Sequence, residues 1–75
     1  MPKYPILKAS QIIKVLNKFG FELVRQKWSH IQMKNLTSNK FTTVPNHSSS
    51  VVDPYLLKLI LEQCDISLDE FMKKF

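Results

Sequence analysis

The chain has 75 residues, of which 44% are hydrophobic and 11% aromatic, and it carries a formal net charge of +5. This length allows one small hydrophobic core, so we expect a single domain over residues 1–75, and it disfavours folds with a deep dinucleotide or P-loop cleft. No apolar run approaches the roughly 18 residues of a membrane helix, and residues 1–5 lack the apolar stretch of a signal peptide. We therefore expect a cytoplasmic protein with no membrane partner.

The positive charge is concentrated in the first two thirds of the chain. Residues 1–50 carry eight lysines and arginines against Glu22 alone, whereas residues 51–75 carry three against five carboxylates. A lysine-rich surface attracts polyanions such as nucleic acid, although lysines also serve simply as solvated surface. The charge pattern therefore permits nucleic-acid binding without requiring it.

The first expected element is a helix that begins near residue 10. Ser10 occupies an N-cap position, apolar residues recur at helical spacing, and Gly20 ends the segment in a conformation that suits glycine. The apolar positions are Ile12, Ile13, Val15, Leu16 and Phe19.

Three antiparallel strands follow, because the apolar period shortens after Gly20. Each is short and bounded by turn residues. The predicted strands are Phe21 to about Lys27, residues 29–35 and residues 40–44, with a tight turn near Lys27 and Trp28, a second turn over residues 36–39, and Pro45 as the end of the third strand.

Two helices complete the expected order. Residues 46–52 are polar and predict a connecting loop. Asp53 and Pro54 then form an N-cap and first helical position, and Ser67 and Glu70 have the spacing of a capping box. The sequence thus predicts an α+β fold, a three-stranded antiparallel sheet packed on helices in the order α-β-β-β-α, with a short extra C-terminal helix. The leucine-rich second helix should lie centrally in the core.

The middle strand predicts an open polar face. Ile31 and Met33 share one side of this strand, whereas His30, Gln32 and Lys34 share the other. If the helices cover one face of the sheet, His30 points to solvent beside a lysine and an amide. The pattern alone also fits the ordinary outward residues of a half-exposed sheet.

Few catalytic chemistries fit these residues. Metal sites need clustered carboxylates or histidines, but Glu22 is isolated and the other carboxylates follow residue 52, so we expect no metal and no cofactor. Cys64 lies in an apolar segment and predicts a buried small side chain. RNA cleavage asks for less, because RNA carries its own nucleophile and needs mainly a proton-transferring histidine and nearby cations.

Three motifs in order carry a family resemblance. They are GFELVRQKWSH at residues 20–30, TVPNH at residues 43–47 and ISLDEF at residues 66–71. With the leucine-rich helix between the last two, they resemble the HicA (YcfA-like) family of toxins over nearly the whole chain. The resemblance implies a small mRNA interferase with a double-stranded-RNA-binding-domain-like fold, paired with a HicB antitoxin that covers the active surface.

The resemblance also implies site residues. The family's catalytic histidine ends a Gly-Ser-His signature, which here reads Trp28, Ser29 and His30. The tryptophan stacks on a base, packs against the first helix or occludes the site. Ser29 either orients His30, contacts phosphate or is a plain strand hydroxyl. His47 matches a Pro-x-His pattern and either fixes its loop or assists proton transfer or phosphate binding.

The combined hypothesis is a metal-independent endoribonuclease of a HicA/HicB-type pair, with His30 as general acid or base. Its phosphate contacts would come from cations on or beside the sheet, namely Arg25, Lys27, Lys34 and Lys40. Two alternatives stay open at this point. One is a non-catalytic RNA-binding module of double-stranded-RNA-binding type, with activity lost through Trp28, and the other is a structural adaptor for another protein.

Overall fold

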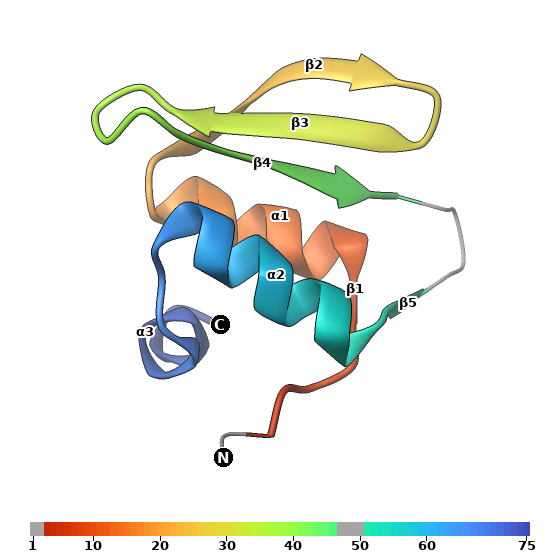
Figure 1. The fold of residues 1–75 in the computed structure, drawn as a ribbon, viewed down its shortest axis with the longest axis vertical. Coiled ribbons are helices and arrows are strands. Elements are labelled where there is room, and N and C mark those ends of the chain that lie inside the picture. The colour runs from red at the N-terminus through yellow and green to blue at the C-terminus, as the bar shows by residue number, and fades with distance from the viewer. Residues whose placement is uncertain (1–2, 47–50) are drawn as a thin grey trace.

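The computed structural model describes residues 3–46 and 51–75. The fold is α+β, and its main elements follow the predicted order (Figure 1). No helix in these two segments is long and apolar enough to cross a membrane. The elements are β1 (Leu7–Lys8), α1 (Ala9–Lys18), β2 (Phe21–Lys27), β3 (His30–Asn35), β4 (Lys40–Pro45), β5 (Val51–Val52), α2 (Pro54–Cys64) and α3 (Leu68–Lys73).

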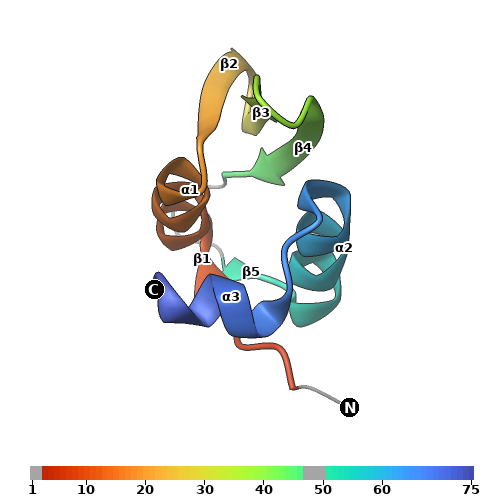
Figure 2. The same ribbon diagram turned by 90° about the vertical axis from the view of Figure 1, so that its left-hand side faces the viewer.

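The molecule is layered, with helices on one side of the sheet only. Strands β2, β3 and β4 form an antiparallel meander in that spatial order. Helices α1 and α2 lie side by side against one face of it, and α3 crosses beneath both helices (Figure 2). No described element covers the opposite face of the sheet, where side chains such as Arg25, His30 and Phe41 are exposed.

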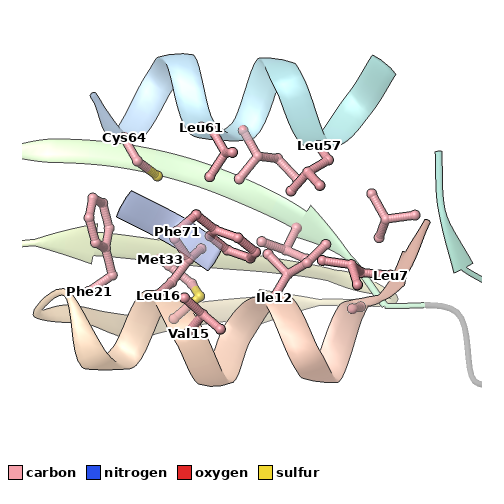
Figure 3. Packing of buried hydrophobic residues seen from close by; sticks show 14 of the residues in the cluster. Leu7, Ile12, Val15, Leu16, Phe21, Met33, Leu57, Leu61, Cys64 and Phe71 are labelled. Carbon is pink, nitrogen blue, oxygen red and sulfur yellow. The ribbon is translucent and has the colours of Figure 1, made fainter. Parts of the chain in front are cut away.

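The core lies between the sheet and the helices, as Figure 3 shows. Ile31 and Met33 of β3 are 4% and 0% exposed, which confirms the predicted inward side of this strand. Thr42 is the buried polar residue beside them, and its Oγ1 donates a hydrogen bond of 2.7 Å to Oε1 of Gln63 on α2. A buried hydroxyl without such a partner would be costly, so this bond secures β4 to α2. The helices supply Ile12, Val15, Leu16, Leu57, Ile60, Leu61 and Phe71 to the same core.

The structure contains a second, two-stranded sheet, formed by β1 and β5, which the sequence did not predict. Leu7 pairs with Val52 and Lys8 with Val51 in antiparallel register. The prediction of a loop over residues 46–52 is therefore wrong at Val51 and Val52, and residues 47–50 lie outside the described part of the chain. Strands of two residues show no alternation, so their pairing has no pattern in the sequence.

The start of α1 corrects another prediction. Ser10 lies inside the helix, and Lys8 is the flanking residue, with an extended backbone at φ −81° and ψ 152°. The β1–β5 pairing holds Lys8 extended, so the helix begins at Ala9. The Gln11 side chain then accepts a hydrogen bond of 2.9 Å from the Lys8 N–H. Gln11, not Ser10, therefore caps this end.

Gly20 connects α1 to the sheet in the left-handed conformation that its residue type predicted. Its φ is +93°, and a Cβ at this position would lie 3.3 Å from Nδ2 of Asn35. That nitrogen donates to the Phe19 carbonyl at 3.0 Å, while Oδ1 of Asn35 accepts from the N–H groups of Thr37 and Ser38. Asn35 thus holds together the α1–β2 connection and the β3–β4 turn.

The predicted starts of the last two helices are confirmed, although the Asp53 side chain makes no capping hydrogen bond at α2. Pro54 is the first residue of α2, directly after Asp53. At α3, Ser67 Oγ accepts from the Glu70 N–H at 3.1 Å, and Glu70 Oε1 accepts from the Ser67 N–H at 3.4 Å. This reciprocal pair is the capping box that the spacing of the two residues indicated.

We expect Ser67→Ala to lower the free energy of unfolding by about 1 kcal/mol, because it removes a cap. Ser10→Ala should lower it by less than about 0.5 kcal/mol, because this exposed serine caps nothing and alanine has the higher helix propensity. Chemical denaturation of the two variants measures both values. A larger loss for Ser10→Ala than for Ser67→Ala would contradict the observed start of α1.

Candidate functional site on the open face of the sheet

The open face consists of three cross-strand rows of side chains. Register places one residue from each of β2, β3 and β4 in each row, and the inward positions of β3 between the rows are the buried residues Ile31 and Met33. We call this set of residues the open face. The rows are Lys27–His30–Pro45, Arg25–Gln32–Thr43 and Glu22–Lys34–Phe41.

A β-bulge at Val24 determines which side chains of β2 join the open face. Leu23 lies opposite the inward Met33, but the next paired residue is Arg25, opposite the outward Gln32. Without the extra residue Val24, strict alternation from Phe21 would turn Arg25 and Lys27 toward the helices. The bulge therefore turns both cations to the side of His30, as bulges beside functional sites commonly do.

His30 is the first residue of β3 and is exposed. It lies between Lys27 on one neighbouring strand and Pro45 on the other, so its Cβ is about 4.5 to 5.5 Å from the Cβ atoms opposite. Arg25 belongs to the next row on the same face. A solvent-accessible imidazole beside two cations can exchange protons with a bound anion.

Of the remaining predicted site residues, Lys34 and Ser29 lie on or beside the open face, whereas Lys40 does not. Lys34 is on the open face, in the row farthest from His30, and Ser29 is in the β2–β3 turn, where its carbonyl accepts from the Asn46 N–H. Lys40 instead lies opposite the inward-facing Asn35 and lines a hollow of about 200 Å³ near Cys64. The structure thus separates Lys40 from the other cations. His47 lies outside the described residues, and its role stays a prediction.

The buried thiol offers no nucleophile. Cys64 is 4% exposed, as the sequence indicated, and burial raises the pKa of its thiol to about 12. It therefore stays protonated at neutral pH, and the thiolate is the reactive form. Among residues 3–46 and 51–75, no group of three or more histidine, cysteine or acidic side chains is placed to hold a metal ion.

Comparison with known protein families decides the identity. Residues 9–66, more than half of the chain, match the family model described as HicA toxin of bacterial toxin-antitoxin. The chain belongs to the HicA family. This membership makes it the toxin of a toxin–antitoxin pair. A search of curated proteins found no match.

Trp28 departs from the HicA signature at a position with an unusual backbone. It is the first of two turn residues between β2 and β3, and its φ is +56°. Glycine adopts this conformation freely, so the glycine that the resemblance implies at this position would fit the turn without strain. The alternative that Trp28 packs against the first helix is wrong, because the side chain is 84% exposed. Its ring instead contacts the Lys27 ammonium, whose Nζ is 5.1 Å from the ring centroid.

Trp28→Gly should raise the free energy of unfolding by about 1 kcal/mol relative to Trp28→Ala, because alanine keeps the Cβ that opposes a positive φ. Equilibrium unfolding in urea compares the two variants directly. Because neither variant removes a core contact, the free energy of unfolding of the wild-type protein should be close to that of Trp28→Ala. If Trp28→Gly were the less stable of the two, the turn would not be strained.

Proposed function

We propose that this HicA-family toxin is an endoribonuclease that cleaves mRNA on the open face, with His30 as general acid or base. The observation that carries the proposal is the row that pairs exposed His30 with Lys27, with Arg25 in the row beside it. Proton transfer and charge stabilisation, the two needs of RNA cleavage, are then met within one patch.

The proposed reaction uses the nucleophile that RNA carries. The 2′-hydroxyl oxygen bonds to the adjacent phosphorus, the bond from phosphorus to the 5′-oxygen breaks, and a cyclic phosphate and a free 5′-hydroxyl result. One proton leaves the 2′-oxygen and one joins the 5′-oxygen, and His30 carries one of these transfers. Lys27 and Arg25 stabilise the additional negative charge on the phosphate oxygens in the transition state.

The side chains around His30 would bind the substrate. We assign base stacking to Trp28, because its ring is exposed beside the row of His30. Ser29 would orient His30 or contact phosphate, and Lys34 would contact phosphate farther along the face. On this assignment Trp28→Gly, although more stable, should bind RNA more weakly, by about 1 to 3 kcal/mol.

Replacing His30 by alanine should lower the rate of RNA cleavage roughly 10²- to 10⁴-fold and abolish toxicity in cells. The side chain points away from the core, so the free energy of unfolding should change by less than about 0.5 kcal/mol. Cleavage of a labelled transcript, thermal unfolding and growth after induction measure the three effects. Wild-type cleavage rates from folded His30→Ala would refute the assignment.

The same cleavage assay, repeated with wild-type protein in excess chelator, tests whether a metal takes part. The proposal requires no loss of rate, because His30, Lys27 and Arg25 supply the chemistry. Abolition of cleavage by the chelator, with recovery on adding a divalent cation, would refute the metal-independent mechanism while leaving the toxin role intact.

The antitoxin, in our proposal a HicB-like protein, covers the open face with an acidic surface. The cations of this face would attract such a surface, and complementary charge mainly raises the association rate. Burial of His30 in the interface would then explain inhibition, because the catalytic group and the phosphate contacts become inaccessible together.

The exchange Arg25→Gln/Gln26→Arg tests both partners at constant net charge. It moves one cation from the open face to the position opposite the inward-facing Ile31. For single-stranded RNA, the slope of log affinity against log salt should decrease in magnitude by about 0.7, the value for one lost phosphate contact. Antitoxin association should slow at low salt. Gln26→Arg alone is the control, and it should reduce neither the salt slope for RNA nor the rate of antitoxin association. An unchanged slope in the exchanged variant would remove Arg25 from the site.

Trp28 gives one specific reason to keep a second candidate, a non-catalytic RNA-binding module. In that case the wild-type protein would bind RNA without forming product. His30 is itself exposed, so the tryptophan ring does not cover it, and this favours the nuclease. An adaptor that binds only protein would show no salt-dependent RNA affinity at all.

A further inference from the structure

The two edges of the open face differ in chemistry. Strand β2 contributes Arg25 and Lys27 to it, with Glu22 at the far end. Strand β4 contributes only uncharged side chains, which are Phe41, Thr43 and Pro45. A ligand with charge along one side and flat apolar groups along the other fits this division, and a single nucleic-acid strand has that form.

Packing within the fold does not explain why β4 has a phenylalanine at position 41. Its neighbour Thr42 is 0% exposed, and strand alternation therefore turns Phe41 to the open face, opposite Lys34. There it is 47% exposed, although phenylalanine is usually a core residue. The ring lies at the end of the face away from Trp28, four positions along β3 from His30, or about 13 Å at the usual rise of a strand.

The middle of the face supplies hydrogen-bonding groups between these two aromatic side chains. Gln32 and Thr43 form the central row with Arg25, and both are partly buried. An amide and a hydroxyl can bond the edges of unpaired bases, whereas bases in a duplex are stacked on each other and cannot stack on protein rings. The face is therefore suited to single-stranded rather than double-stranded RNA.

We infer that the open face is a track for single-stranded RNA, in which the phosphate backbone follows β2, the bases lie over β4, and Phe41 stacks on a base distant from the cleaved bond. This inference rests on the proposed function and adds to it a second stacking site and an arrangement in which backbone and bases lie over different edges of the sheet. Phe41 is a binding residue in this arrangement, not a catalytic one.

The test measures the affinity of 2′-O-methylated oligoribonucleotides, which lack the 2′-hydroxyl nucleophile, for Phe41→Ala, Phe41→Leu and Phe41→Tyr. Stacking predicts that the alanine and leucine variants each bind at least about fivefold more weakly, while tyrosine retains wild-type affinity. Tyr55→Ala is the matched control, because Tyr55 is 66% exposed on α2, away from the open face. It should bind as the wild type does. Thermal unfolding verifies that each variant is folded.

An oligonucleotide with one abasic position adds a second measurement. Scanning the abasic site along the strand should find one position where Phe41→Ala causes no further loss, because the base that it stacks on is already missing. Wild-type affinity in folded Phe41→Ala and Phe41→Leu would overturn the inference. If those variants instead bound only the antitoxin more weakly, Phe41 would be a protein contact, and the inference would also fail. Failure of the proposed function looks different, since the wild-type protein would then form no cleavage product, whether or not it binds RNA.

Discussion

The packing of β3 against the helices is the constraint on which the rest of the structure depends. Ile31 and Met33 are held in the core, and side chains alternate along this strand, so His30, Gln32 and Lys34 must lie on the opposite side of it. A slip of one residue would bury His30 and expose Met33, at a cost of several buried contacts. The hydrophobic core thus positions the open face, although no core residue belongs to it.

The bulge at Val24 adds the charge to this arrangement. The core alone would present His30, Gln32 and Lys34 beside a β2 whose cations pointed toward the helices. The extra residue reverses that half of β2 and brings Lys27 into the row of His30. The chemistry proposed for the site therefore depends on one irregular residue as much as on regular packing, and the irregularity lies in the strand farthest from α2.

The sequence pattern predicted the helices and strands that are long enough to show a regular alternation of apolar and polar residues. The three strands of the meander, the existence of α2, the capping box at Ser67 and the left-handed Gly20 are all confirmed. The central position predicted for α2 is wrong, because this helix lies beside α1 and exposes Tyr55 and Leu59. The β1–β5 pairing could not be predicted, because it joins two-residue segments far apart in the chain. The bulge could not be predicted either, because one extra residue leaves the strand pattern ambiguous. The prediction that Lys40 joins the other cations is wrong for a different reason, since regular alternation puts Lys40 on the same side of β4 as the buried Thr42 and Val44.

The connections of the meander are short, so its strand pairs form quickly during folding. Trp28 and Ser29 join β2 to β3, and residues 36–39 join β3 to β4, so both strand pairs close between near neighbours. Such hairpins form in about 1 to 10 μs, whereas a ribosome adds only about 5 to 20 residues per second. Once the helices that support it are available, the sheet assembles far faster than any second protein can be synthesised. The fold therefore adds no appreciable delay between synthesis of this chain and formation of its open face.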